Sequence, residues 1–352
     1  MLEQNITQYL RNIFAKEKDP LKDILGQEAA KQQLKSALLM ARHVIIVGPP
    51  GIGKTTLARN VAELLPYVEA VEGCSYHCSP ENPICPECKS KERKRLKKNL
   101  IKGSERFVRV QGSPDLSVED LLGDIDPVKA LKFGPMAIES FTPGKVFKAN
   151  GGILFFDELN RAPEKLQNAM LQVLEESKVT INSYDVELPV NFIFIATMNP
   201  QDTSTEKLSD VFLDRFDLVF MDYPEKLETE KHIVEMKGKK LIGFPDKLLT
   251  NSIYFVRLLR ENSKIEKKPS VRASIGIYER AQANAFLKGK KAVTFEDVKD
   301  AILSVLSHRI ELKPSFRYLQ SPADFVKEEF SKLSNNFSGV RVGHGIEQGD
   351  SP

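Results

Sequence analysis

Long hydrophobic runs are missing from this sequence of 352 residues. Its apolar stretches, such as Val44–Val47, are a few residues long, whereas a membrane-spanning helix needs about 18 or more. The segment Met1–Asp19 mixes Glu, Arg and Lys with scattered apolar residues, so it lacks the hydrophobic region of a signal peptide. We therefore expect no membrane partner and a cytoplasmic location.

An excess of charge of either sign is also missing, because 51 Lys and Arg stand against 48 Asp and Glu. The overall charge therefore favours no class of partner. One segment differs, since Lys89–Lys102 contains eight basic residues and one Glu. We interpret it as a lysine-rich helix that is either simply solvated or binds nucleic acid or an acidic protein. It contains no aromatic residue, so base stacking is not indicated.

Cysteine is absent from almost the whole chain, and all four copies are spaced Cys-x₃-Cys-x₆-Cys-x₂-Cys. Without a secretion signal, such clustering favours a metal site over a disulfide framework. Four thiolates suit tetrahedral zinc, with an iron–sulfur cluster or unligated thiols as the alternatives. With four thiols available, we expect His77 to stay outside the ligand set. The predicted ligands are Cys74, Cys78, Cys85 and Cys88.

Short apolar segments of the kind that form strands buried on both faces alternate with helical patterns in the first part of the chain. This alternation predicts an α/β fold with a parallel sheet covered by helices. The predicted strands are Val44–Val47, Phe107–Val110, Ile153–Phe156 and Phe192–Ala196, and helices are predicted over Thr55–Leu65 and Glu164–Glu176.

After Pro224 no strand-like run remains and helical periodicity dominates. Helices are predicted over Glu225–Met236, Asp246–Glu261, Val271–Leu287 and Phe295–His308, the last opening on Thr294 and Asp297 in the spacing of a capping box. We expect an N-terminal helix (residues 1–20), an α/β core (21–224) with a cysteine-rich insertion (73–102), an α-helical lid domain (225–315), a C-terminal helix (316–334) and a disordered tail (335–352).

The sequence Gly48-Pro-Pro-Gly-Ile-Gly-Lys-Thr55 has the phosphate-binding loop pattern between a predicted strand and a predicted helix. Its glycines let backbone N–H groups converge on phosphate oxygens at the positive end of the helix. Lys54 should contact the β- and γ-phosphates, and the Thr55 hydroxyl should bind Mg²⁺. No Asn-Lys-x-Asp guanine motif is present, so ATP is favoured. The predicted nucleotide-binding residues are Gly48, Pro49, Pro50, Gly51, Ile52, Gly53, Lys54, Thr55 and Thr56, with Ile24 and Leu25 as the adenine wall.

Two adjacent carboxylates follow the apolar run Ile153–Phe156. Ligands of open α/β sheets bind at the carboxyl ends of the strands, which is where Asp157 would lie. Beside a phosphate loop, we expect Asp157 to hold the Mg²⁺ shell and Glu158 to polarise the attacking water.

These motifs come in the order of AAA+ ATPases, and the chain resembles the MoxR and magnesium-chelatase I-subunit branch over roughly residues 20–310. The resemblance is carried by Gly151–Pro163, Gln167-Asn168, Leu174–Glu176, Thr197–Pro200 and Asp214-Arg215-Phe216. It implies that Asn199 is the first sensor of the γ-phosphate and Arg215 the arginine finger for a neighbouring subunit. It further implies that Arg272 is the second sensor, on the lid, and that Arg161 is an interface arginine.

The resemblance also accounts for two insertions. Ser117–Gly144 resembles this clade's helix-2 insertion, and Val179–Pro189 has the alternation of a hairpin with Asn182-Ser183 at its turn. Such loops face the ring pore or a partner in related machines, and ordinary surface loops are the alternative.

The resemblance implies a hexameric ring that hydrolyses ATP to remodel a partner protein, often one with a von Willebrand factor A domain, or to drive metal insertion. A nucleic-acid translocase or helicase-like motor, using Lys89–Lys102, is the alternative. A nucleotide-dependent switch with negligible turnover is a third hypothesis, which Glu158 and Arg215 disfavour.

Overall fold

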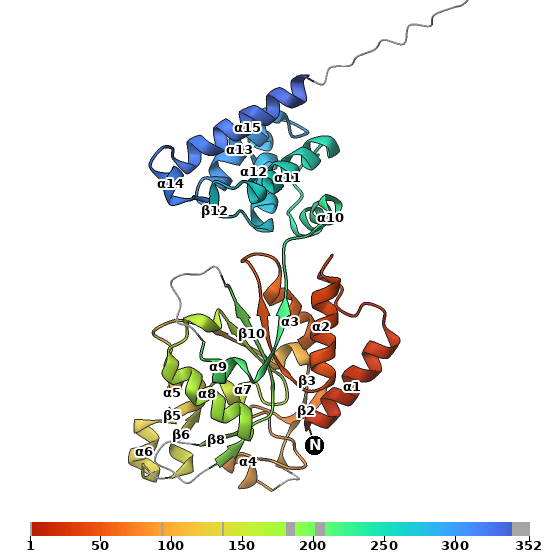
Figure 1. The fold of residues 1–352 in the computed structure, drawn as a ribbon. Coiled ribbons are helices and arrows are strands. Elements are labelled where there is room, and N and C mark those ends of the chain that lie inside the picture. Colours follow the sequence, from red (N-terminus) through yellow and green to blue (C-terminus); the bar gives the residue numbers. More distant parts are fainter. Residues whose placement is uncertain (1, 93–94, 136, 181–186, 201–207, 340–352) are drawn as a thin grey trace, which may run out of the picture. The chain divides into compact units, whose positions relative to one another are not determined.

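Residues 2–92, 95–135, 137–180, 187–200 and 208–339 are described by the computed structural model of the chain. They form two compact units, Met1–Asp222 and Tyr223–Pro352 (Figure 1). Among the described helices, none combines the length and the apolar character that crossing a bilayer requires.

A five-stranded sheet forms the centre of the first unit, and all its strands run parallel in the order β11-β1-β10-β7-β4. The α/β prediction is therefore confirmed, and all four predicted strands are present. The fifth, β11, was not predicted. It is an edge strand whose Leu218 and Phe220 are exposed, so its sequence lacks a continuous buried run. The strands are β1 (His43–Val47), β4 (Phe107–Gln111), β7 (Ile153–Asp157), β10 (Ile193–Met198) and β11 (Phe216–Phe220).

Alternate residues of each strand point into two different hydrophobic cores. In β7, Ile153 and Phe155 enter one core, whereas Leu154 and Phe156 enter the other. Figure 1 shows one set of helices on each face of the sheet. The first core is covered by α1 (Leu2–Lys16), α2 (Glu28–Leu39) and α3 (Lys54–Leu64), and the second by α5 (Val118–Leu122), α7 (Lys145–Lys148), α8 (Glu164–Glu176) and α9 (Asp210–Leu213).

The cysteine-rich insertion follows α3. The strand β2 (Val68–Val71), just before the predicted start of the insertion at residue 73, pairs antiparallel with β3 (Lys98–Ile101) near its end, and α4 (Pro86–Lys89) lies between them. The prediction of a helix over residues 89–102 is wrong, because the second half of this basic segment hydrogen-bonds to β2 and closes the base of the loop. Long-range strand pairing therefore overrides the local helical preference of its lysines.

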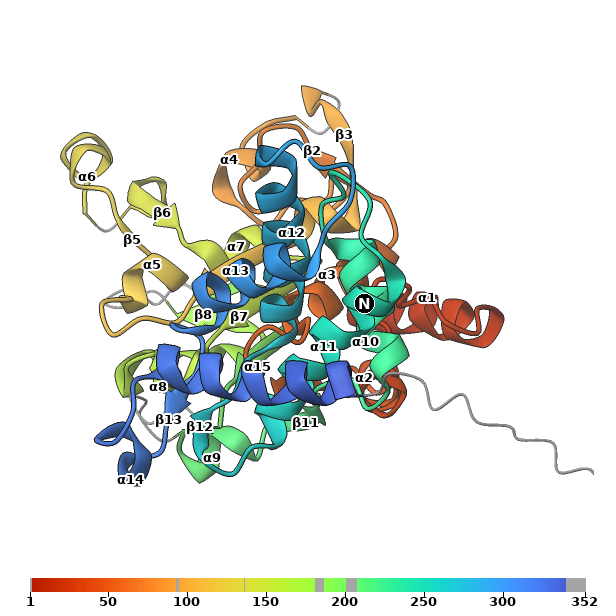
Figure 2. The same cartoon turned by 90° about the horizontal axis from the view of Figure 1, so that it is seen from above.

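The helix-2 insertion folds as an arm in which β5 (Gly123–Ile125) and β6 (Phe141–Pro143) pair antiparallel around α6 (Pro127–Phe133). Figure 2 shows α6 at the outer end of this arm. The other insertion pairs β8 (Lys178–Thr180) with β9 (Glu187–Pro189), which confirms the hairpin. Its predicted turn at Asn182-Ser183 lies outside the described residues.

The second unit is mainly helical, as predicted, and it has its own hydrophobic core. The prediction that no strand follows Pro224 is wrong, because β12 (Ile265–Lys267) and β13 (Glu311–Leu312) pair antiparallel. Both are too short to leave a periodic signal. The single helix expected from residue 316 is split into two, and the second continues past 334 to Gly339. The helices are α10 (Leu227–Lys237), α11 (Asp246–Glu261), α12 (Val271–Leu287), α13 (Phe295–Leu306), α14 (Pro314–Arg317) and α15 (Pro322–Gly339).

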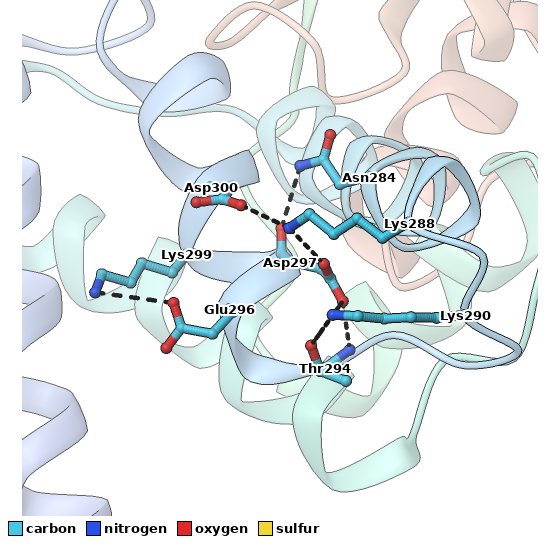
Figure 3. A network of polar contacts seen from close by, with 8 residues as sticks. All are labelled: Asn284, Lys288, Lys290, Thr294, Glu296, Asp297, Lys299 and Asp300. Atoms are coloured by element: carbon cyan, nitrogen blue, oxygen red, sulfur yellow. Dashed lines mark hydrogen bonds and ion pairs between the residues drawn. The ribbon is translucent and has the colours of Figure 1, made fainter.

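Asp297 links the start of α13 to the end of α12 by hydrogen bonds and ion pairs (Figure 3). Its buried carboxylate accepts hydrogen bonds from the backbone N–H and hydroxyl of Thr294 at 3.0 and 2.6 Å. It also pairs with Lys288 at 2.9 Å and Lys290 at 2.8 Å. The capping interaction predicted at Thr294 is confirmed, and the two lysines link it to the end of α12.

Candidate ATPase site

The carboxyl edge of the sheet brings together the predicted phosphate loop, the two adjacent carboxylates and Asn199. The register places Ile46 beside Thr197, and Gln111 beside Asp157. The residues that follow these positions therefore emerge at one edge, because the four strands are parallel. They include Gly48 of the phosphate loop, Glu158 and Asn199.

The phosphate loop joins β1 to α3 in a conformation that requires glycine. Gly51 and Gly53 have φ values of 74° and 101°, in the left-handed region. A Cβ on Gly48 would lie 2.2 Å from the Met221 carbonyl oxygen, so a larger residue would displace the backbone at Met221. Lys54 starts α3, and its ammonium donates hydrogen bonds to the carbonyls of Gly48 and Pro49. The loop thus surrounds the lysine that should bind phosphate.

Ile24 lies against the phosphate loop, since its Cδ1 would be 3.1 Å from a Cβ built on Gly53. Asp23 and Asn60 hold this segment on α3 by reciprocal hydrogen bonds of 3.2 and 2.7 Å. Ile24 is buried and Leu25 is half-buried. This placement supports Ile24-Leu25 as an apolar wall beside the nucleotide.

Thr197 contacts both residues of the acidic pair, Asp157 and Glu158. Its hydroxyl donates to Asp157 Oδ1 at 2.6 Å and accepts from the backbone N–H of Glu158 at 2.9 Å. Glu158 has a φ of 56°, in the left-handed region, which is uncommon for a residue with a side chain. Thr197 was part of the sequence resemblance, but no role was predicted for it.

The strand β4 supplies two further partners that the sequence interpretation missed. Arg109 pairs with Asp157 Oδ2 at 2.5 Å, and the Gln111 amide donates to Glu158 Oε2 at 2.9 Å. Arg161 also reaches Glu158, at 3.1 Å within the same chain. Polar residues at the end of a strand next to the acidic pair were the available signal, because neighbouring parallel strands end at the same edge.

Arg215 lies at the other end of the sheet. It directly precedes β11, whose first residue is paired with His43, the first residue of β1. The five residues of β1 separate that level from Gly48, a distance of about 16 Å at ~3.3 Å per residue. Arg215 pairs there with Glu175 of α8 and donates to the Val211 carbonyl at 2.6 Å. The structure therefore does not bring Arg215 to the phosphate loop of its own chain.

Arg272 is exposed in the first turn of α12, in the second unit. A buried carboxylate, Glu230, fixes this turn by accepting from Ser274 Oγ at 2.6 Å and from Arg260 at 2.6 Å. Arg260 Nε donates in turn to the Pro269 carbonyl at 2.7 Å. The start of the helix that carries Arg272 is thus held by charged hydrogen bonds rather than by packing alone.

The four cysteines converge as the sequence predicts, with their Sγ atoms within 4.8 Å of one another. All four are free thiols, and three are buried. Burial and the neighbouring thiols raise the pKa of Cys88 to about 12. His77 is not a member of this group among the described residues.

Comparison with known families agrees with these features. The ATPase family associated with various cellular activities (AAA) matches residues 89–218, the AAA lid domain matches 258–329, and the magnesium chelatase subunit ChlI family matches 20–80.

A magnesium-chelatase subunit ChlI homolog of Methanocaldococcus jannaschii is 30% identical, covering 90% of this chain and 91% of its own. A magnesium-chelatase 38 kDa subunit of Acidiphilium rubrum is 28% identical over 77% and 84% of the two chains. The crystal structure of NtrX from Brucella abortus has the same fold, with a TM-score of 0.50 and 17% identity over 89% and 63% of the two chains. The resemblance expected from the motifs is therefore confirmed: this chain is an AAA+ ATPase that belongs to the family of the magnesium-chelatase subunit ChlI.

Proposed function

We propose that copies of this chain form a ring. Each ATP site is formed by the phosphate loop of one subunit and is completed by Arg215 of the next. The main support for this proposal is that Arg215 lies about 16 Å along the sheet from the phosphate loop of its own chain. A contact between the front of one subunit and the back of its neighbour would bring the two ends together. Such head-to-tail contacts close into rings, and we propose a hexamer.

Lys54, Thr55 and Asp157 provide the groups that a nucleotide with Mg²⁺ requires. The ammonium of Lys54 binds phosphate oxygens, while the Thr55 hydroxyl and the Asp157 carboxylate are the hard oxygen ligands that Mg²⁺ prefers. Mg²⁺, when bound, would neutralise phosphate charge. Thr197 and Arg109 keep the Asp157 carboxylate oriented toward this edge of the sheet.

Glu158 and Asn199 would act on the γ-phosphate. Glu158 accepts a hydrogen bond from the attacking water, whose oxygen bonds to the γ-phosphorus as the bond to ADP breaks. Gln111 and Arg161 contact the same carboxylate and hold it in one rotamer. We assign Asn199 as the first sensor, and Arg272 as the second sensor on the lid.

We further propose that ATP hydrolysis acts on a partner protein. The named relatives are subunits of a larger enzyme, magnesium chelatase. The arm exposes large apolar side chains on α6, with Val128 76% and Leu131 92% exposed. Val128 and Leu131 are three residues apart on the helix and so lie on one face, and a contiguous exposed apolar patch marks a protein-binding surface. We also propose that this partner contains a von Willebrand factor A domain and that the complex acts in metal insertion.

The proposal is tested by measuring ATPase activity per subunit against protein concentration. Activity should rise steeply as rings assemble, and Arg215→Ala should lose roughly 10³-fold or more while still binding ATP. Arg42→Ala is the matched control, because Arg42 pairs with Asp217 at the same end of the sheet. Concentration-independent activity that is unaffected by Arg215→Ala would contradict the ring. Strong stimulation by DNA would instead favour a nucleic-acid motor using residues 89–102.

A further inference from the structure

The four-cysteine cluster has the dimensions of a site for one metal ion. Zinc bound to four sulfurs at ~2.3 Å places those sulfurs about 3.8 Å apart in a tetrahedron. The Sγ atoms of Cys74 and Cys85 are 3.8 Å apart, and all four lie within 4.8 Å. An S–S bond is about 2.05 Å long, so this spacing is not that of a disulfide. An iron–sulfur cluster separates its cysteines further, because several iron and sulfide ions lie between them.

Backbone hydrogen bonds to the sulfurs favour thiolate ligands. Cys78 Sγ accepts from the N–H groups of Ile84 and Cys85, each at 3.3 Å. Cys85 Sγ accepts from the N–H of Cys88 at 3.4 Å. Hydrogen bonds to the charged form stabilise it and orient a ligand before it meets the metal.

The apolar cluster inside the loop around the cysteines is small. Its own apolar cluster contains Val71 and Leu96 besides the three buried cysteines. The remainder of the loop is rich in polar residues and proline. A cluster this small supplies little hydrophobic free energy, whereas metal binding contributes directly to folding.

Tyr76 connects this loop to the arm. It lies between two of the cysteines, and its ring contacts that of Phe147 at a centroid distance of 5.1 Å. Phe147 contacts Phe141, the first residue of β6, at 5.7 Å. The Tyr76 carbonyl also accepts a hydrogen bond of 3.1 Å from the side chain of Asn150. In addition, α4 contacts the short 3₁₀ helix η3 (Ile138–Ser140), which lies in the arm between α6 and β6.

We propose that Cys74, Cys78, Cys85 and Cys88 bind one structural zinc ion, and that this ion positions the arm through Tyr76, Phe147 and Phe141. The site is closed, with four protein ligands and no position for a substrate, so its role is mechanical. It lies on the unit that binds ATP but shares no residue with the phosphate loop. The proposal is therefore independent of the ring mechanism.

The zinc assignment is tested by elemental analysis of the purified full-length protein. About one zinc per chain is expected. Cys85→Ser should lose that zinc and keep ATP binding, which reports that the sheet is still folded. A protein without metal, or one with iron and visible absorbance, would overturn the assignment.

The coupling to the arm is tested by hydrogen exchange of residues 138–143 in the same preparations. Loss of zinc in Cys85→Ser should speed their exchange roughly tenfold or more. Tyr76→Ala should do the same while retaining zinc, and Tyr76→Phe should behave as wild type because its ring is kept. Tyr67→Ala is the control, since Tyr67 is 63% exposed. Zinc loss that leaves exchange in 138–143 unchanged would refute the coupling.

Discussion

In the proposed mechanism, individual side chains at the carboxyl edge of the sheet have separate roles in binding and hydrolysing ATP. Lys54 is held at the start of α3 by loop carbonyls, so its charge is in place before phosphate arrives. Glu158 is fixed by Thr197, Gln111 and Arg161 rather than by burial. Binding and hydrolysis should therefore respond differently to substitution of these two residues.

Lys54→Ala should weaken ATP binding by roughly 10²-fold or more, because a charged phosphate contact is lost. Glu158→Gln should bind ATP nearly normally and lose roughly 10²–10⁴-fold in turnover, because the amide cannot accept the proton of the water. Nucleotide-binding titrations and single-turnover hydrolysis separate the two effects. Glu63→Gln, on an exposed part of α3, is the control. Wild-type turnover by Glu158→Gln would refute its role.

Single site residues could be predicted from the sequence where they belong to a contiguous motif. The phosphate loop and the acidic pair could be predicted because each is contiguous and flanked by a buried strand. Arg109, Gln111 and Thr197 could not be assigned, because their roles depend on which strands are neighbours, and one sequence does not reveal strand order. The structure shows the strand order β10-β7-β4, so Thr197 of β10 and the β4 residues Arg109 and Gln111 lie on either side of β7.

Among the secondary-structure elements, long periodic segments were predicted well and short paired ones were not. The core strands and the main lid helices have strong apolar patterns. By contrast, β3, β12 and β13 contain two to four residues each, and long-range hydrogen bonding determines them. The basic segment 89–102 shows this most clearly, since its lysines favour a helix locally but β2 recruits part of it into a hairpin.

The junction of α12 and α13 gives a prediction about pH. Burial opposes ionisation of Asp297, but hydrogen bonds from Lys290, Thr294 and Lys288 hold its pKa well below the ordinary value of 3.8. A pKa lowered by folding adds stability above the unfolded pKa, and that stability is lost as the pH falls below about 4. Asp297→Asn should therefore melt at a lower temperature than wild type at pH 7, and the difference should shrink below pH ~4.

Scanning calorimetry is the suitable measurement, because the chain contains no tryptophan for fluorescence. Asp300→Asn is the matched control, since Asp300 also pairs with Lys288 but is 55% exposed. A melting difference for Asp297→Asn that stays constant from pH 7 to pH 3 would show that the charge of Asp297 is not what stabilises the junction.

At the scale of the whole molecule, the proposed ring follows from a nucleotide site that is incomplete within one subunit. One chain provides the phosphate loop, the metal ligands and Glu158 at one end of its sheet, and Arg215 at the other. The phosphate loop and Arg215 of one subunit cannot both contact the same nucleotide, because the length of the strands separates them. Activity should therefore belong to an interface, and two differently damaged subunits should complement each other.

Mixing Lys54→Ala and Arg215→Ala subunits tests this claim most directly. Each variant alone should be almost inactive, the first because it lacks the loop lysine and the second because every site lacks its arginine. In an equimolar mixture, an interface is active when the loop comes from the Arg215→Ala subunit and the arginine from the Lys54→Ala subunit. Random assembly into rings predicts roughly a quarter of the wild-type ATPase rate. A mixture that shows only the sum of the two residual activities would contradict the shared site.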